Sequence, residues 1–358
     1  MQFMARRKSN KIEPAVLTFS LQTQTIPAAT QPGGPGTAIT PSVTTLYCDY
    51  SQIASLYNRR FYRQGLNWAA AGMKLLSSPT IPTGNTTVDA YVTVSKLPNT
   101  WVLANSWEKS MRTWMRMNNE ALSETDSVRP KFLDFKIYAD SGHHTAGFAA
   151  NWLPPLYTAG EWSASKASIP LVSPAGAFSP GETVEREFIA IGASYPGVSP
   201  ATGFDALSLI EGYAASRGLP NIADPNTPDD ASDIGGGTPE NWMQAIFNEG
   251  VDQAADVIED MITENTIAPY PFENDGVSTD TMYPGGANQA PYLEIHDQHP
   301  VTSSTLGGTT RLKGGNFPCG LVKFQLINYS LFDVDMGMMI DLVPGNHRGY
   351  LCESMTEM

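Results

Sequence analysis

The residues that could carry metal or acid–base chemistry gather in one short segment. The stretch Glu294-Ile-His-Asp-Gln-His299 holds two of the five histidines and two carboxylates. Imidazoles and carboxylates are ordinary metal ligands and ordinary general acids and bases. On an extended strand His296 and Asp297 point to opposite faces, and His299 shares the face of Asp297. One metal ion would therefore need a turn, which Pro300 permits. His296 and His299 remain the only metal candidates, and loop or interface histidines are the preferred interpretation.

Other catalytic signatures are missing from the sequence. It contains no Gly-x-Ser-x-Gly motif, no phosphate-binding P-loop and no dinucleotide-binding fingerprint. The His-x-His spacing of cupin-type metalloenzymes is absent as well. An acidic loop at residues 224–237 lacks the ligand spacing of a calcium-binding EF-hand, so a solvated loop is expected. We therefore predict no catalytic residue, no cofactor and no enzyme activity.

Two basic clusters are candidates for contact with nucleic acid. The first eleven residues contain Arg6, Arg7, Lys8 and Lys11 and no acidic residue. The whole chain has a net charge of −14, so the remainder carries −14 − 4 = −18. A short basic arm on an acidic body suits phosphate contact, in which released counterions supply the affinity. The alternative is a solvated, frayed terminus.

The second basic cluster is Arg59, Arg60 and Arg63, interleaved with Phe61 and Tyr62. Arginines beside aromatic rings can clamp a backbone and stack bases. The alternative is a helix end that packs its aromatic rings and leaves the arginines in solvent. Three further cations, Lys109, Arg112 and Arg116, share one side of an expected helix, and a solvated face is the preferred interpretation.

Composition limits the classes of protein that fit. Only 16% of the 358 residues are charged, and the negative net charge excludes a protein that coats nucleic acid over its whole surface. Three widely spaced cysteines give neither a disulfide framework nor a metal knuckle. The sequence shows no secretion signal and no apolar stretch long enough for a membrane span. These features predict a soluble protein that folds in a reducing compartment.

Most of the expected elements are strands, because apolar residues recur at every second position. Alternation at residues 15–26, 88–95, 133–139, 322–326 and 334–342 predicts strands with one buried face. A sixth strand is expected at 184–191, and 65–76 and 291–296 are weaker candidates. About eight strands separated by long connections favour an antiparallel β-sandwich.

Helices are expected within the connections. Asn105 and Glu108 form a capping box ahead of a helix whose stripe includes Trp107 and Trp114. A second helix begins at Thr238, and shorter helices are expected at 51–60 and 205–217. The predicted fold class is mainly β, an antiparallel β-sandwich of viral jelly-roll type with helical insertions. A double jelly roll, which needs about sixteen strands, is the alternative.

These elements divide the chain into an arm and a body. Residues 1–14 form the basic arm, and residues 15–358 form the jelly-roll domain, with insertions at about 51–64, 105–123 and 200–290. The low charge and the 35 aromatic residues (7 Trp, 14 Tyr and 14 Phe) suit a subunit that buries much of its surface against neighbours.

Local motifs resemble a known group of proteins. Asn-Arg-Arg-Phe-Tyr-Arg-Gln-Gly at 58–65, Leu-Pro-Asn-Thr-Trp at 97–101, Trp-Glu-Lys-Ser at 107–110 and Trp-Met-Arg-Met at 114–117 are similar to capsid proteins of small circular single-stranded DNA viruses and phages. The resemblance covers about a sixth of the chain. It implies a jelly-roll shell subunit, present in many copies, that encloses a genome with its basic arm facing inward. The arm is shorter and less basic than in many such proteins. The resemblance therefore leaves room for another protein or a lipid layer between the shell and the genome.

The sequence thus predicts the major capsid protein of an icosahedral virus. Its partners would be other copies of the chain, a single-stranded DNA genome, minor capsid proteins or an internal membrane, and a host receptor of unknown kind. The protein would be part of the virion and would assemble in the host cytoplasm or nucleus. One alternative is a viral spike or lectin-like sandwich that stacks sugars on Trp152, Tyr157 and Trp162. The other is a metal-dependent β-sandwich enzyme built around His296 and His299.

Overall fold

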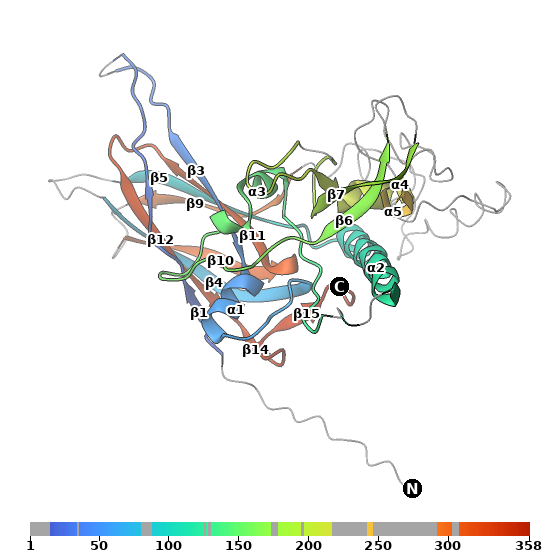
Figure 1. The fold of residues 1–358 in the computed structure, drawn as a ribbon. Helices are drawn as coiled ribbons and strands as arrows, with labels where there is room; N and C mark the ends of the chain where they lie inside the picture. The colour runs from blue at the N-terminus through green and yellow to red at the C-terminus, as the bar shows by residue number, and fades with distance from the viewer. Residues whose placement is uncertain are drawn as a thin grey trace, which may run out of the picture.

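The computed structural model describes residues 15–33, 36–79, 88–124, 127, 130–172, 178–194, 197–216, 242–245, 292–302 and 308–358. Its centre is a sandwich of two antiparallel sheets, beside which the inserted elements form a second body (Figure 1). The predicted arm at 1–14, the acidic loop at 224–237 and most of the helix expected from Thr238 lie outside the described residues.

The first sheet of the sandwich has the order β1-β12-β4-β10. These strands are β1 (Thr18–Ser20), β12 (Val334–Leu342), β4 (Leu66–Pro79) and β10 (Thr309–Phe317). Two short strands extend it: β2 (Gln24–Ile26) pairs with β12, and β15 (Cys352–Ser354) pairs with β4. The second sheet has the order β3-β11-β5-β9, made of β3 (Ser42–Asp49), β11 (Leu321–Asn328), β5 (Asp89–Lys96) and β9 (Glu294–Thr302).

Strand pairing in the sandwich is nested along the chain. The outermost pair is β1 with β12, followed inward by β3 with β11, β4 with β10, and β5 with β9, all antiparallel. The pairs β12 with β4 and β11 with β5 then join these ribbons into the two sheets. Each long pair therefore joins segments from opposite halves of the chain.

The main core lies between the two sheets, and it explains the alternation in the sequence. On β12 every second residue from Val334 to Leu342 is buried, and on β5 Ala90, Val92 and Val94 are buried. The predicted strands at 88–95, 322–326 and 334–342 are confirmed. The weaker candidate at 65–76 is the long strand β4. The described residues thus form a mainly β, antiparallel sandwich.

The insertion between β5 and β9 has its own core. It contains α2 (Trp101–Glu124), α3 (Ser141–Ala146), a sheet of β6 (Lys166–Val172), β7 (Phe178–Ile189) and β8 (Ala206–Ser208), then α4 (Leu209–Ser216) and α5 (Trp242–Ala245). Trp107, Phe135, Phe188 and Trp242 are buried together there. Helix α1 (Tyr50–Asn58) joins β3 to β4, and the short hairpin β13 (Pro344–Gly345) and β14 (Gly349–Tyr350) precedes β15.

Some predicted elements differ from the structure. The helix predicted at Asn105 starts four residues earlier, at Trp101, where Thr100 Oγ1 accepts a 3.4 Å bond from the amide of Leu103. Asn105 lies inside α2 and donates its side-chain amide to Tyr213 instead. The predicted strand at 15–26 breaks into β1 and β2, and Leu17 is exposed rather than buried.

Segment 133–139 is extended but is not a ladder strand, apart from a single bridge between Tyr138 and Ile189. Phe135, Ile137 and Ala139 are buried as the alternation predicts. Backbone amides of this segment bond to side chains, as described below, so alternation identified the extended backbone but not its partners.

The described residues contain one sandwich, and the sheet in the insertion has three strands. They therefore supply no second sandwich for the double jelly roll alternative. No described helix is both long enough and apolar enough to cross a bilayer. All three cysteines are unpaired.

Candidate nucleic-acid interface

Helix α1 sets the position of Arg59 and Arg60. It starts at Tyr50, and the N-cap residue Asp49 accepts at Oδ1 from the amides of Ser51 at 2.8 Å and Gln52 at 3.3 Å. It ends at Asn58, and Arg59 follows in the left-handed region at φ 51°. This residue reverses the chain, and Arg59 and Arg60 are exposed at the helix end.

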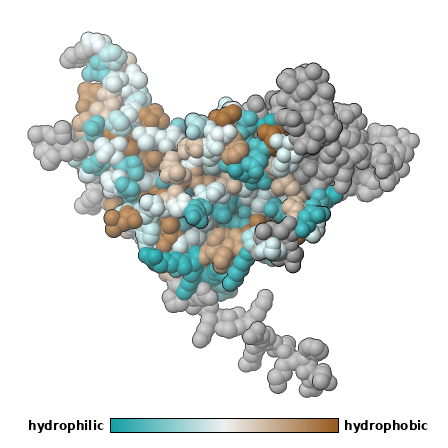
Figure 2. Space-filling view, viewed as in Figure 1, coloured by the Kyte–Doolittle hydropathy of each residue, from teal (hydrophilic) through white to brown (hydrophobic). Residues whose placement is uncertain are grey.

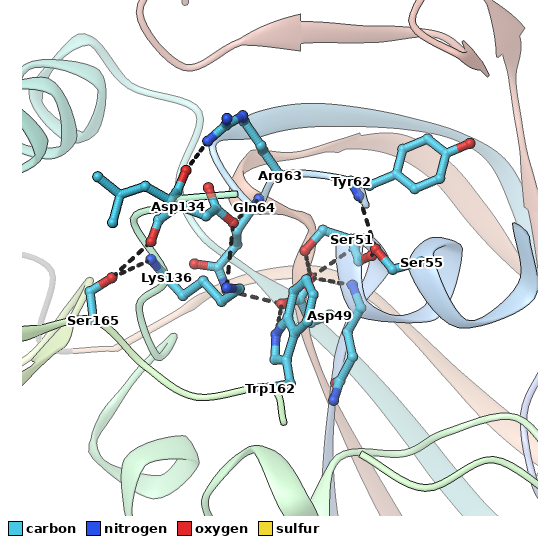
Figure 3. A network of polar contacts seen from close by, with 12 residues as sticks. Asp49, Ser51, Ser55, Tyr62, Arg63, Gln64, Asp134, Lys136, Trp162 and Ser165 are labelled. Atoms are coloured by element: carbon cyan, nitrogen blue, oxygen red, sulfur yellow. Dashed lines mark hydrogen bonds and ion pairs between the residues drawn. The ribbon is translucent and has the colours of Figure 1, made fainter. Parts of the chain in front are cut away.

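Asp49 is also the centre of a buried polar network (Figure 3). Its Oδ2 accepts from Gln64 Nε2 at 3.0 Å and from Trp162 Nε1 at 3.2 Å. Burial raises the pKa of Asp49, and the hydrogen bonds to it act in the opposite direction. We call Asp49, Gln64, Asp134 and Trp162 the polar junction. Its members come from β3, from the loop before β4 and from the insertion, so it joins the sandwich to the insertion.

Gln64 holds this junction together through three hydrogen bonds to the segment 134–137. Its Oε1 accepts from the amide of Ile137 at 2.6 Å, and its Nε2 donates to the carbonyl of Ile137 at 3.1 Å. The backbone amide of Gln64 donates to Asp134 Oδ2 at 3.1 Å. These bonds satisfy backbone groups that a neighbouring strand would otherwise pair. Burial raises the pKa of Asp134 to about 6.

The junction supports an exposed group of cations. Arg63 is exposed, and its guanidinium donates to the carbonyl of Leu133 and lies 5.7 Å from the centroid of the Phe61 ring. Arg348 is also exposed and donates to the carbonyl of Phe61 at 2.7 Å. We call Arg59, Arg60, Arg63, Lys131 and Arg348 the basic surface. All three arginines of the second predicted cluster are exposed at or just after the end of α1, and Arg63 also bonds to the backbone of Leu133.

The basic arm joins the fold beside this surface. The amide of Val16 donates to Asn58 Oδ1 at 3.0 Å, and its carbonyl accepts from Tyr350 at 2.6 Å. Asn58 is the residue before Arg59. Arg6, Arg7, Lys8 and Lys11 lie outside the described residues, but the chain that carries them attaches next to the basic surface. On the face drawn in Figure 2, hydrophilic side chains gather at the lower edge of the sandwich.

The cations of α2 are engaged on their own helix or with α4. Arg112 pairs with Glu108 at 2.5 Å and Arg116 with Glu120 at 3.0 Å. Lys109 lies 3.4 Å from the Ser216 hydroxyl and over the ring of Tyr213. Arg112 and Arg116 are exposed, as preferred from the sequence, whereas Lys109 is half-buried against α4.

The two histidines of β9 contact different groups. His299 Nε2 is 3.3 Å from Asp297 Oδ2, on the face that strand geometry predicts. His296 Nε2 is 3.2 Å from the carbonyl of Lys313, and its ring packs against Phe317. Within the described ranges no three His, Cys, Asp or Glu side chains lie close enough to hold a metal ion.

Of the three aromatic residues that the lectin-like alternative assigned to sugar stacking, one is buried and two are half-buried. Trp152 is 1% exposed and packs edge-on against Phe324, so the prediction of an exposed Trp152 was wrong. The indole of Trp162 donates to Asp49. The half-buried ring of Tyr157 lies 5.7 Å from that of Tyr57.

Buried histidines extend the network and were not singled out as site residues from the sequence. His143 Nδ1 accepts from the amide of Ala139 at 3.2 Å, and Nε2 lies 2.8 Å from Asn151 Oδ1. Asn151 donates to Gln52 on α1 at 2.8 Å. Burial lowers the pKa of His143 to about 4. His144 Nε2 lies 3.0 Å from the buried carboxylate of Glu187.

Lys131 and Arg348 were also missed. The pair Lys131-Phe132 repeats the cation-aromatic pattern of Arg60-Phe61, a signal that was present in the sequence. Arg348 has no such neighbour, because it reaches Phe61 from a distant part of the chain.

Comparison of the chain with protein-family models, with curated proteins and with solved structures finds no match.

Proposed function

We propose that this chain is the major capsid protein of an icosahedral virus, a self-assembling structural subunit that encloses a single-stranded DNA genome. We further propose that its sandwich is a jelly roll, that the virion is its site of action, and that it performs no catalysis.

The nested pairing of strands carries this proposal. In a jelly roll the first strand pairs with the eighth, the second with the seventh, the third with the sixth and the fourth with the fifth. The pairs β1 with β12, β3 with β11, β4 with β10 and β5 with β9 match that order. Jelly rolls form virus shells, and they also form lectins and cupin enzymes. The buried Trp152 and the separate contacts of His296 and His299 favour the shell over those two classes.

Charge and surface chemistry support the same choice. Val16, just after the arm, bonds to Asn58 beside the basic surface at the α1 end of the sandwich, which suits contact with phosphate. Near the opposite end of β3, Val43 is 52% exposed and Leu331 is 54% exposed. Hydrophobic side chains are visible at that end of the sandwich (Figure 2). Apolar side chains on a subunit surface are the kind that neighbouring subunits cover.

Electron microscopy of the chain expressed alone tests the proposal. We expect closed particles of uniform size whose ratio of absorbance at 260 and 280 nm reveals nucleic acid that survives nuclease treatment. Deletion of residues 1–11 should reduce that ratio. A chain of full length with Gln at positions 6, 7, 8 and 11 should show the same reduction. A uniform monomer or trimer without nucleic acid, in every salt concentration, would contradict the proposal and favour the spike or lectin class.

A further inference from the structure

A row of three aromatic rings runs through the basic surface. Phe132 is 59% exposed, and its ring centroid lies 5.4 Å from that of Phe61. The Phe61 ring lies 6.3 Å from the ring of Trp162, which is anchored to Asp49. The row is therefore fixed by the polar junction at its inner end and open to solvent at its outer end.

Cations surround the row. Lys131 Nζ lies 5.3 Å from the centroid of Phe132, and Lys136 Nζ lies 5.5 Å from that of Phe61 and 4.5 Å from that of Trp162. Three carboxylates are near, and the buried Asp49 accepts from Trp162. Asp134 lies beside Lys136 and accepts from Gln64, and Glu161 is exposed next to Trp162 in the sequence. With Arg59, Arg60, Arg63 and Arg348 on the same surface, positive charge predominates there.

We propose that this row is a binding site for single-stranded nucleic acid, in which an unpaired base stacks on Phe132 and the flanking phosphates contact Lys131, Arg59 and Arg60. Every base has a π-face, so stacking on a ring tolerates any sequence, but a base inside a duplex has both faces covered. The row therefore selects single strands, whereas phosphate contact by the arm does not. The inference rests on the nucleic-acid contact proposed above and names the form of nucleic acid that the surface takes.

Fluorescence anisotropy with a labelled oligothymidine of about 12 nucleotides tests this site. The protein is the full chain with Gln at positions 6, 7, 8 and 11, at a salt concentration at which it sediments as free subunits. We expect Phe132→Ala to weaken binding of the oligothymidine about tenfold and to change the affinity for a duplex of equal charge by less than about twofold. Phe132→Trp should retain the affinity for the oligothymidine. Phe132→Leu keeps an apolar side chain but no ring, so it should lose as much of that affinity as Phe132→Ala.

Two matched variants control for general effects. Tyr292→Ala removes an aromatic ring that is 82% exposed, and Arg311→Ala removes an exposed arginine on β10. Both should leave the oligothymidine affinity unchanged. An unchanged affinity of Phe132→Ala, or an equal loss for duplex and single strand, would overturn the site. Loss of particles in Phe132→Ala with unchanged affinity would also overturn it and assign Phe132 to contact between subunits.

The two proposals fail in different ways. Failure of the aromatic site alone leaves particles and their nucleic acid intact. Failure of the capsid proposal leaves no particles, while the effect of Phe132→Ala on the oligothymidine remains.

Discussion

At the scale of single residues, Asp49 is the residue on which most of the local structure depends. It caps α1, and it receives the side chains of Gln64 and Trp162 from two other segments. A fully buried carboxylate is stable in such a place because several donors replace its water.

Replacement of this carboxylate should therefore be costly. Asp49→Ala leaves the amide of Ser51, Gln64 Nε2 and Trp162 Nε1 without their acceptor, and we expect the free energy of unfolding to fall by about 3 kcal/mol or more. Urea unfolding of the subunit measures this. Asp335→Ala, which removes one 2.7 Å bond from Thr25, should cost less than about 1 kcal/mol. Equal costs for the two variants would refute the central role of Asp49.

His143 should make the subunit sensitive to acid. Its pKa is lowered to about 4 by burial, against 6.5 for the unfolded chain, and it faces Asp140, His144 and Lys323. Between these pH values the unfolded chain binds the proton first, so this residue lowers the free energy of unfolding as pH falls from about 6.5 to 4, by up to about 3 kcal/mol. His143→Gln should be destabilised at pH 7, and its deficit relative to wild type should shrink towards pH 4.

Asp134 provides the opposite control. Its pKa is raised to about 6, so the folded chain binds the proton first between about pH 6 and 4, and this residue adds stability as pH falls. The free energy of unfolding of Asp134→Asn, relative to that of wild type, should therefore be highest at pH 7 and should fall in acid. Urea titrations at pH 7, 5.5 and 4.5 give the difference in free energy of unfolding between each variant and wild type. We expect this difference to change with pH in opposite directions for His143→Gln and Asp134→Asn. A change in the same direction would contradict both assignments.

At the scale of elements, the contact between the loop before β4 and helix α2 depends on a glycine. A Cβ on Gly65 would lie 2.5 Å from Cζ2 and 2.7 Å from Cη2 of Trp107, whose indole is buried in the core of the insertion. The sandwich and α2 approach this closely because position 65 has no side chain.

Gly65→Ala should push α2 away from the sandwich. We expect a loss of about 1–3 kcal/mol, the usual cost of overpacking, and a change in the near-ultraviolet signal of buried tryptophan. The control is Gly72→Ala on β4, where the nearest atom to a new Cβ is the carbonyl oxygen of Leu312 at 3.6 Å. A Gly65→Ala subunit as stable as this control would show that α2 moves freely.

The strands that were predicted from apolar alternation and confirmed share one property. β5, β11 and β12 bury one face and leave the other partly open, so burial alternates with period two. β3 escaped prediction because its last residues, Tyr47, Cys48 and Asp49, are all buried. β10 escaped because it contains Gly314 and Gly315, which fit where the carbonyl of Ala70 and the ring of His296 come close.

The candidate site was predicted only where it is local in sequence. Arg59, Arg60 and Arg63 lie within five positions of one another, so one sequence window revealed the cluster. Arg348 and the junction between Gln64 and segment 133–137 depend on contacts across 70 or more positions, which no local pattern records.

At the scale of the whole molecule, the proposed function predicts that charge governs both assembly and contact with nucleic acid. The chain carries −14 overall, and its arm carries four positive charges. Subunits without nucleic acid repel one another, and salt screens that repulsion. We expect salt to promote the assembly of empty shells and to weaken the binding of nucleic acid.

The contribution of the arm can be measured from this salt dependence. If its four cations contact phosphate, Gln at positions 6, 7, 8 and 11 should reduce the slope of log K against log salt by about 3 for a single strand. The control places Gln at Arg112 and Arg116, which are already paired with Glu108 and Glu120, and should change the slope little. An unchanged slope for the arm variant would exclude the arm from phosphate contact.

The nested pairing of strands also favours an order of folding. The innermost pair, β5 with β9, closes a loop that contains the whole insertion, and such closure costs entropy that grows with loop length. Leu97 and Leu293, at the two ends of that loop, are buried in the same core of the insertion. An insertion that folds first brings β5 and β9 together and removes most of that cost. Of the strands in the nested pairs, the ribosome makes β12 last, so β1 waits without its partner until the other three pairs can already form.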